Sequence, residues 1–232
     1  MSAQLPLGLR WPAHQRFEEF RVGANGVAVD LFKRAANEAA QTALFLAGPL
    51  GSGRTHLLIA TCAAANAVGR SAQYLPLATL RDADASIRAF GGSDLVALDD
   101  VDAIAGDDKA EHALFDLYNR CRGEGASLVF AASAPPAQVG LALPDLVSRL
   151  SACTQLMLKP LGEAERRELL RERAAARGIE IDDAVIDWLF AREKRDLASL
   201  LGVLDRVDAA SLAAQRRVTV PFLRKLLDAE IS

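Results

Sequence analysis

The sequence predicts an α/β domain, in which helices cover both faces of a parallel sheet, followed by a small all-helical domain. Short apolar runs alternate with helical segments as far as Pro160, and such runs are typical of strands that are buried on both faces. After Pro160 the strand-like runs stop and only helical patterns follow. We therefore expect a flexible N-terminal segment over residues 1–15, an α/β domain over residues 16–160 and a helical domain over residues 161–232.

The elements follow from the apolar runs and from the residues that break them. Pro6, Pro12 and Gly23 predict irregular structure in the first 25 residues. Strands are expected over residues 43–47, 72–75, 95–98, 128–132 and 155–158. Helices are expected over residues 27–40, 54–67, 80–90, 109–122 and 143–150 and, in the second domain, over residues 163–177, 182–191, 196–214 and 219–229.

The composition is that of a folded protein without a broad positive charge. The 232 residues are 51% hydrophobic, with 27 Lys and Arg against 30 Asp and Glu. This excludes a disordered chain and removes the electrostatic footprint of a sequence-independent DNA binder. Cys62, Cys121 and Cys153 form no Cys-x-x-Cys pair and are expected to be buried thiols. The uncharged stretch over residues 125–144 is split by two prolines, which predicts a strand and a loop rather than a membrane span.

A glycine-rich loop follows the first predicted strand. Its sequence, Gly48-Pro49-Leu50-Gly51-Ser52-Gly53-Arg54-Thr55, fits the pattern G-x-x-x-x-G-K-[ST] except at Arg54. Gly51 and Gly53 permit the positive φ angles with which backbone N–H groups curl around an anion. The next helix offers its N-terminal N–H groups, and the Thr55 hydroxyl suits Mg²⁺. The loop predicts a nucleotide phosphate site, the alternative being a glycine-rich turn without a ligand.

Arg54 stands where the phosphate-loop pattern has lysine. Arginine keeps the positive charge and binds phosphate through two N–H groups, but its planar guanidinium is bulkier than an ammonium group. We therefore expect nucleotide binding to persist, and the geometry needed for hydrolysis to be impaired.

The third predicted strand supplies the second half of this site. Leu95-Val96-Ala97-Leu98 runs into Asp99 and Asp100, and the carboxyl end of a parallel strand lies at the sheet edge that also carries the phosphate loop. Asp99 is expected to hold Mg²⁺ through water, and Asp100 to polarise an attacking water. A strand that runs into an acidic turn is the alternative.

Together these motifs resemble those of the AAA+ ATPases, specifically of the DnaA-related group. Residues 17–25 (FEEFRVGAN) resemble the group's F-x-x-F-x-x-G-x-N element, which lies against the adenine, and residues 53–57 (GRTHL) resemble its G-K-T-H-L. Residues 146–150 (LVSRL) resemble the box that carries an arginine finger, and residues 195–197 (RDL) resemble the second sensor on the lid. Pieces shared with the shorter homologues of DnaA lie at residues 115–120, 143–146 and 214–217.

The resemblance implies a set of site residues and cofactors. Arg149 would be an arginine finger that acts in trans, Asp100 would be catalytic, and Thr55 and Asp99 would hold Mg²⁺ beside bound ADP or ATP. Ser133, at the place of the family's first sensor, can form a hydrogen bond but supplies no charge. The residues expected to contact the nucleotide are Phe17, Phe20, Gly23, Asn25, Gly48, Pro49, Leu50, Gly51, Ser52, Gly53, Arg54, Thr55, His56, Asp99, Ser133 and Arg195.

The N-terminal peptide over residues 4–9 (QLPLGL) resembles the sliding-clamp-binding peptide of the shorter DnaA homologues. The resemblance implies that Gln4, Leu5, Leu7 and Leu9 contact the clamp, the β subunit of DNA polymerase III, as an extended tethered ligand would. An ordinary frayed terminus is the alternative. The resemblance also implies a chain that ends with the lid, lacks the DNA-reading domain of DnaA and reaches DNA only through the clamp.

Three functions stay open at this point. In the first, which the resemblance favours, the chain binds the clamp and promotes hydrolysis of DnaA-bound ATP through Arg149, has weak or no ATPase activity itself, and so prevents over-initiation of replication. The second is a self-contained ATPase that loads or remodels a replication partner. The third is a DNA-binding initiator fragment, supported only by the basic pairs at residues 216–217 and 224–225. We expect a cytoplasmic protein that is nucleoid-associated through the clamp and makes no membrane contact; the sequence does not decide whether it forms a homodimer.

Overall fold

The structure, a computed structural model, describes residues 11–12, 14–192, 200–204, 206–207 and 219–228. The chain divides into two compact units, one formed by Met1–Pro49 and Gly53–Lys159 and the other by Leu50–Ser52 and Pro160–Ser232. The predicted clamp-binding residues 4–9 and Arg195 lie outside the described residues.

The first unit is built on a five-stranded parallel sheet in the order β2-β3-β4-β1-β5. The strands are β1 (Ala43–Ala47), β2 (Ala72–Pro76), β3 (Leu95–Asp99), β4 (Ser127–Ala132) and β5 (Thr154–Met157). Because successive side chains of a strand point to opposite faces, the buried strands β1, β3 and β4 contribute to two cores at once.

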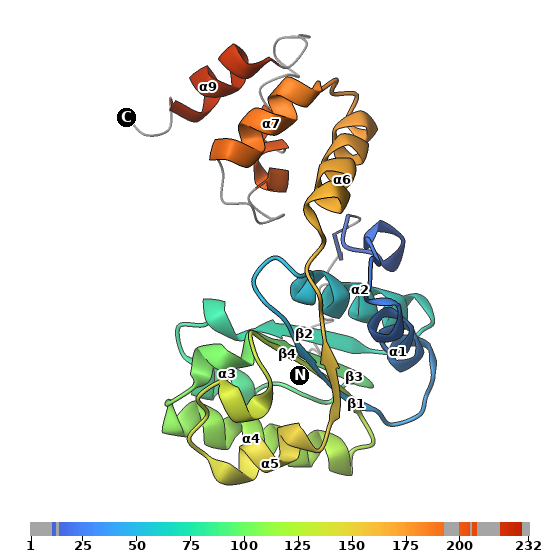
Figure 1. Ribbon diagram of the computed structural model, residues 1–232. Coiled ribbons are helices and arrows are strands. Elements are labelled where there is room, and N and C mark those ends of the chain that lie inside the picture. Colours follow the sequence, from blue (N-terminus) through green and yellow to red (C-terminus); the bar gives the residue numbers. More distant parts are fainter. Residues whose placement is uncertain (1–10, 13, 193–199, 205, 208–218, 229–232) are drawn as a thin grey trace, which may run out of the picture. The chain divides into compact units, whose positions relative to one another are not determined.

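One helix group covers each face of the sheet (Figure 1). The first face packs against α1 (Gly26–Asn37) and α2 (Arg54–Ala67), and its core includes Leu46, Ala97 and Val129. The second face packs against α3 (Ala83–Arg88), α4 (Asp108–Gly123) and α5 (Pro144–Ser151). Its core includes Phe45 and Phe130, whose rings stack with their centroids 6.5 Å apart. The predicted parallel sheet with helices on both faces is confirmed.

Several predicted elements differ from the observed ones, and the first helix ends at Asn37, three residues before the predicted end at residue 40. The third helix is shorter than residues 80–90, because the 3-10 turn η2 (Leu77–Thr79) precedes it and the Asp82 carboxylate caps it by accepting from the Ala85 N–H. The last strand lies one residue earlier than predicted, and mostly exposed, because it is a sheet edge paired only with β1. The first 25 residues are not wholly irregular, since the 3-10 turn η1 (Phe17–Glu19) forms there.

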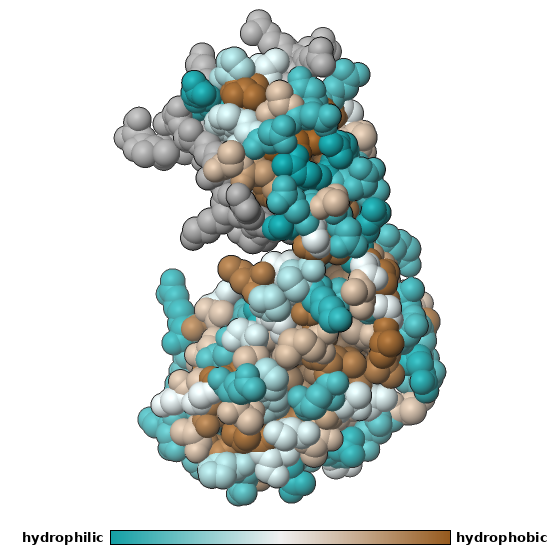
Figure 2. Space-filling view, viewed as in Figure 1, coloured by the Kyte–Doolittle hydropathy of each residue, from teal (hydrophilic) through white to brown (hydrophobic). Residues whose placement is uncertain are grey.

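The second unit is helical where it is described. It contains α6 (Glu163–Ala176), α7 (Asp183–Arg192), helical residues at 200–204 and 206–207, and α9 (Val220–Asp228). Its core is separate from those of the sheet and includes Leu170, Ile186 and Leu204. Charged side chains of α6 and α7 form ion pairs on its surface, and hydrophilic residues predominate on part of the face that Figure 2 shows.

The expectation of buried thiols is met in the described part of the chain. All three cysteines are free and buried there, and burial raises the pKa of Cys62 to about 12 and that of Cys153 to about 11. No helix among the described residues is long and apolar enough to cross a membrane.

Candidate functional site

The glycine-rich loop joins the end of β1 to the start of α2. Gly51 and Gly53 have φ angles of 76° and 97°, in the left-handed region that glycine adopts readily. Gly53 is the N-cap of α2, and no side chain caps the N–H groups of the first turn. Uncapped N–H groups at the start of a helix of this length form a binding site for an anion.

Arg54, at the head of α2, is aimed at the end of β3. One guanidinium nitrogen, Nη2, donates to Asp100 Oδ1 over 3.3 Å, and the side chain is only 10% exposed. The other, Nη1, is buried and has no hydrogen-bond partner among the described residues. A buried N–H without an acceptor costs free energy, and an oxygen of a bound phosphate is the acceptor that this position fits. The residues present therefore suit a nucleotide phosphate.

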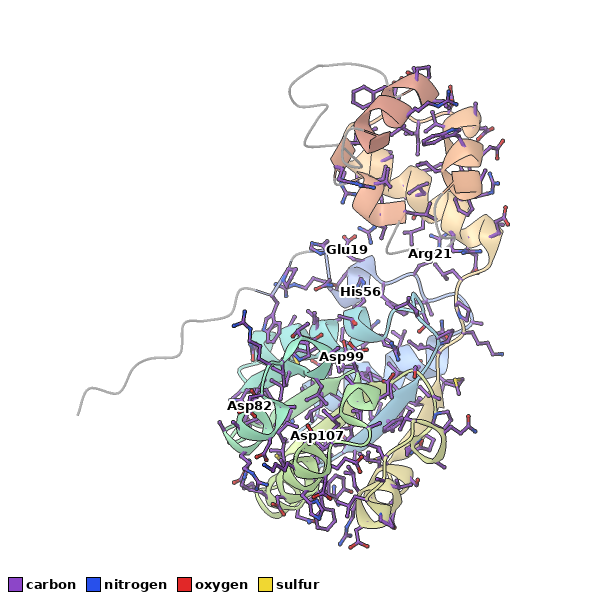
Figure 3. All side chains as sticks on the ribbon, turned by 90° about the vertical axis from the view of Figure 1, so that its left-hand side faces the viewer. Glu19, Arg21, His56, Asp82, Asp99 and Asp107 are labelled. Atoms are coloured by element: carbon purple, nitrogen blue, oxygen red, sulfur yellow. The ribbon has the colours of Figure 1, made fainter. Side chains whose placement is uncertain are left out.

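Asp99 ends β3 almost fully buried, at 1% exposure. Its Oδ2 accepts hydrogen bonds from the Thr55 hydroxyl at 2.6 Å and from the Tyr74 hydroxyl at 2.9 Å, and its Oδ1 accepts from the Asp100 N–H at 3.0 Å. The two residues predicted to hold Mg²⁺, Thr55 and Asp99, are thus in contact. Figure 3 labels Asp99 and also His56, the neighbour of Thr55 on α2.

Asp100 follows with an unusual backbone. Its φ and ψ angles are 53° and 51°, the only positive φ of a non-glycine residue in the described chain. Such a conformation is strained for most side chains but tolerated by aspartate. Burial and the carboxylate of Asp99 raise the pKa of Asp100, and the guanidinium of Arg54 opposes that rise. The predicted water-polarising carboxylate is therefore held in an ion pair at a partly buried place.

The predicted adenine element, residues 17–25, lies against the glycine-rich loop. The Phe20 ring covers Gly53 so closely that an added Cβ would lie 2.6 Å from its Cε2 atom, and the same ring meets that of His56 edge-on. His56 in turn hydrogen-bonds through Nε2 to the Arg16 carbonyl. A side chain at position 53 would collide with the Phe20 ring. Close packing therefore favours glycine here, in addition to the positive φ angle.

Two members of that element have roles inside the fold. Phe17 is buried in the core beneath α1, with the Lys33 ammonium 5.8 Å from its ring centre. The Asn25 side-chain amide donates to the Lys159 carbonyl at 2.9 Å and accepts from its N–H at 2.8 Å. Both side chains hold the segment in place, and the nucleotide contact expected of Phe17 and Asn25 stays a prediction.

Two further predicted residues of the first unit are Ser133 and Arg149. Ser133 follows β4, is exposed, and its N–H donates to Asp102 Oδ1 at 3.1 Å. Arg149 lies in the last turn of α5 and is exposed. Within the described residues, no carboxylate lies within 4.0 Å of its guanidinium.

Two residues of this region escaped sequence reasoning. Tyr74 lies on a neighbouring strand, and its partnership with Asp99 depends on strand order, which no local pattern reveals. Glu111 is fully buried in α4 and accepts from the N–H groups of Gly106, Ala142 and Leu143 at 2.7–3.0 Å. The one available signal in the sequence was the position of Glu111 between Ala110 and Ala113, which both face the core.

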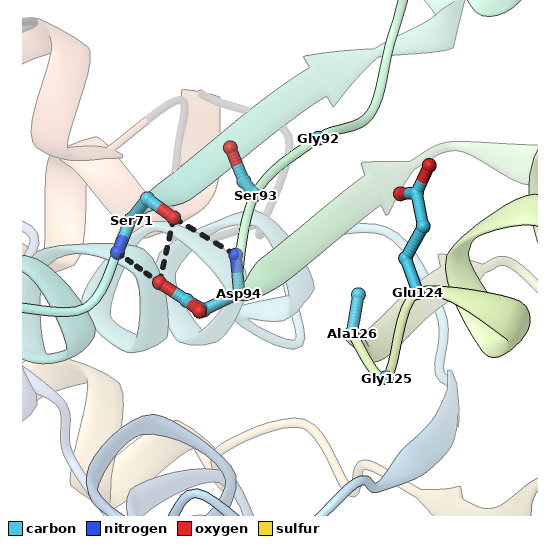
Figure 4. A pocket seen from close by; sticks show the side chains of 7 residues that line it. All are labelled: Ser71, Gly92, Ser93, Asp94, Glu124, Gly125 and Ala126. Carbon is cyan, nitrogen blue, oxygen red and sulfur yellow. Dashed lines mark hydrogen bonds between the residues drawn. The ribbon is translucent and has the colours of Figure 1, made fainter.

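A hollow at the opposite end of the sheet does not belong to this site. Figure 4 shows it at the starts of β2, β3 and β4, where Asp94 Oδ2 accepts from both the N–H and the hydroxyl of Ser71 at 2.7 Å. These hydrogen bonds lower the pKa of Asp94. Ser71 and Asp94 satisfy one another's polar groups, which joins the starts of β2 and β3.

The fold and the site define the class. A five-stranded parallel sheet carries a phosphate-type loop and two acids at its carboxyl edge, and a helical unit follows it, as expected of an AAA+ ATPase domain. The model of the bacterial DnaA ATPase domain matches residues 12–156, more than half of the chain, and the chain belongs to that family. The model of the Hda lid domain matches residues 163–227.

Solved structures agree on the fold. Domain III of the replication initiation protein DnaA from Thermotoga maritima is 21% identical with a TM-score of 0.76, over 94% of this chain and 98% of that one. AMPPCP-bound DnaA from Aquifex aeolicus is 22% identical with a TM-score of 0.67, and the match covers 84% of this chain and 65% of that one. The RuvB Holliday junction branch migration motor of Thermotoga maritima is 19% identical with a TM-score of 0.64, over 94% and 72% of the two chains.

Proposed function

We propose that this chain is a nucleotide-binding regulator that inactivates the replication initiator DnaA by promoting hydrolysis of DnaA-bound ATP. The observation that carries the proposal is Arg149, an exposed guanidinium without a carboxylate partner among the described residues, on a DnaA-family ATPase fold. An unpaired arginine near the end of a short helix is free to enter a second molecule's nucleotide site. The match of the second unit to the Hda lid model supports placing the chain among the DnaA-related regulators.

The resident ligand would be an adenine nucleotide, ADP or ATP, with Mg²⁺. The loop N–H groups, the α2 N-terminus and Nη1 of Arg54 would hold the phosphates, and DnaA structures of this fold are described as bound to AMPPCP. Mg²⁺ would neutralise phosphate charge, with Thr55 and Asp99 beside it. A cation held in this way would be coordinated largely by phosphate oxygens and water.

Arg149 would act on the partner's nucleotide and not on this chain's own. An arginine supplied in trans stabilises the charge that develops in phosphoryl transfer, an effect of about 10³–10⁵ in rate in GTPases. The hydrogen bonds that fix the start of α5 support this role. Glu111 binds the N–H groups of Ala142 and Leu143, directly before the helix, so the helix that presents Arg149 is fixed at its start.

The chain's own hydrolysis would be weak. Asp100, the residue expected to polarise water, is paired with Arg54, and a carboxylate engaged by a guanidinium is a poorer base. Ser133 contributes no charge at the sensor position. The clamp contact through Gln4, Leu5, Leu7 and Leu9 would bring the regulator to replicated DNA in the cytoplasm.

A self-contained ATPase is the second candidate. The contact between Thr55 and Asp99 at 2.6 Å favours it, because this pair is what a Mg²⁺-dependent ATPase needs. ATP turnover by the purified chain alone separates the two candidates. Turnover that is already fast without partners supports the second, and turnover that appears only with clamp, DNA and DnaA–ATP supports the first.

The finger assignment is tested by Arg149→Ala in the complete assay. We expect nucleotide and clamp binding to persist while DnaA-bound ATP hydrolysis falls to DnaA's intrinsic rate, a loss of at least about 10³-fold if the effect matches that of known arginine fingers. Arg122→Ala, at another exposed arginine of the same unit, is the matched control. Normal stimulation by the Arg149 variant would show that the finger is elsewhere.

A further inference from the structure

Asp99 is surrounded by neutral donors only. Its two carboxylate oxygens accept from two hydroxyls and one backbone N–H, and no basic side chain of the described residues lies within 4.0 Å of it. Each donor orients the carboxylate without neutralising its charge, which is what a carboxylate that binds a cation requires. Orientation of such a carboxylate is usually set by its hydrogen-bond partners, and their loss weakens the metal site.

Strand register explains how Tyr74 reaches Asp99. β2 pairs with β3 so that Tyr74 lies opposite Ala97, and Asp99 is two residues farther along β3. Residues opposite each other in a parallel pair share a face, and so do residues two apart on one strand. Tyr74 and Asp99 are therefore on the α2 face of the sheet, the face from which Thr55 also reaches the carboxylate.

The Tyr74 side chain is suited to hold a fixed direction. Its ring packs against the core beneath α2, and its hydroxyl donates to the same oxygen, Oδ2, as the Thr55 hydroxyl.

We propose that Tyr74 is a positioning residue for the magnesium-binding carboxylate of the nucleotide site, which it holds through its hydrogen bond to Asp99. It touches neither phosphate nor cation. The Thr55 hydroxyl alone would leave Asp99 Oδ2 held from one side; the second donor, from the neighbouring strand, fixes its rotation. This inference rests on the proposed nucleotide site and adds the residue on which its Mg²⁺ dependence depends.

The test compares ADP affinity with Mg²⁺ and with EDTA, measured by calorimetry on the full chain. In Tyr74→Phe, which keeps the ring, we expect the gain in affinity that Mg²⁺ gives to fall by about 10-fold, the scale of lost outer-sphere partners, while affinity in EDTA stays unchanged. Tyr118→Phe removes a hydroxyl from the opposite face of the sheet and should change neither value. Asp99→Asn provides the reference for complete loss of the Mg²⁺ effect.

Each outcome bears on a separate claim. An equal loss of affinity in Mg²⁺ and EDTA, or no change in either, would overturn the role of Tyr74. Absence of ADP binding by the unmodified chain in both conditions would instead overturn the proposed nucleotide site. A thermal unfolding midpoint of Tyr74→Phe close to that of Tyr118→Phe shows that the two variants are equally folded, and Mg²⁺ affinity measured by Mn²⁺ competition on the ADP complex gives a second readout of the same ligand set.

Discussion

Arg54 bears on both anion binding and hydrolysis, because its side chain serves the proposed phosphate site and also contacts the carboxylate expected to polarise water. Its guanidinium has one nitrogen on Asp100 and one buried without a partner among the described residues. The arginine in place of lysine predicted a changed geometry at the glycine-rich loop. In the structure this arginine forms an ion pair with Asp100. Arginine is long enough and planar enough to engage a carboxylate and a phosphate oxygen at once, which a lysine ammonium does less well.

Arg54→Lys tests this division of roles. A compact ammonium group should bind phosphate and release Asp100, so we expect ATP turnover by the chain alone to rise about 10-fold, a fraction of what a positioned base can contribute. ADP affinity should change by no more than a few-fold. Steady-state phosphate release measures the first quantity, and Arg122→Lys is the matched exchange at an exposed site. Turnover unchanged by Arg54→Lys would mean that the ion pair does not restrain Asp100.

At the scale of elements, α4 anchors the connection that leads to α5. Asp102, in the 3-10 turn Val101–Ile104 that precedes α4, accepts from the Ser133 N–H at one end of that connection. Glu111, within α4, accepts from the N–H groups of Ala142 and Leu143 at the other end. The Glu111 carboxylate is fully buried. Its acceptor bonds to backbone N–H groups replace the water that burial removes, and they fix the start of the helix that carries Arg149.

Glu111→Gln should destabilise the first unit. One carboxylate oxygen becomes an NH₂ group that faces backbone N–H donors, so we expect a loss of about 2 kcal/mol in the free energy of unfolding. Urea denaturation followed by circular dichroism checks this against Glu124→Gln, an exposed glutamate at the end of the same helix. Equal midpoints for the two variants would show that the buried carboxylate contributes little.

At the scale of the whole molecule, the proposal divides the work between parts of the chain that are distant in sequence. The nucleotide site lies at the carboxyl edge of the sheet, Arg149 on α5, and the expected clamp peptide at residues 4–9, outside the described residues. A net charge of −3 gives no broad attraction to DNA, which agrees with a protein that is brought to DNA by a partner.

The clamp peptide is tested by replacing Leu5 and Leu7 together by alanine. Without its apolar anchors an extended peptide loses its pocket contacts, so we expect clamp pull-down to fall to background while ADP affinity is unchanged. Arg10→Ala, in the same segment, should retain clamp binding. Retention by the double leucine variant would place the clamp contact elsewhere or remove it from the proposal.

Local patterns in the sequence were sufficient for the elements and for the outline of the site. Continuous apolar runs predicted all five strands to within a residue or two, and the glycine pattern predicted a loop with positive φ at Gly51 and Gly53. Such signals are short-range, because period and turn chemistry depend on near neighbours in the chain. The helix over residues 80–90 was predicted too long because a proline-led 3-10 turn and a capping Asp82 set its start.

The sequence by itself determined which residue types stand at the sheet edge: the anion loop, the paired acids and the exchange of lysine for arginine. Tertiary structure alone decided their partners. Arg54 pairs with Asp100. The hydroxyls of Thr55 and Tyr74 both donate to Asp99, and the Asn25 amide donates to the Lys159 carbonyl. These pairs are 25 to 134 positions apart in the chain, and strand order and register bring them together. Since those long-range alignments are set by packing of the whole sheet against its helices, no local pattern can specify them.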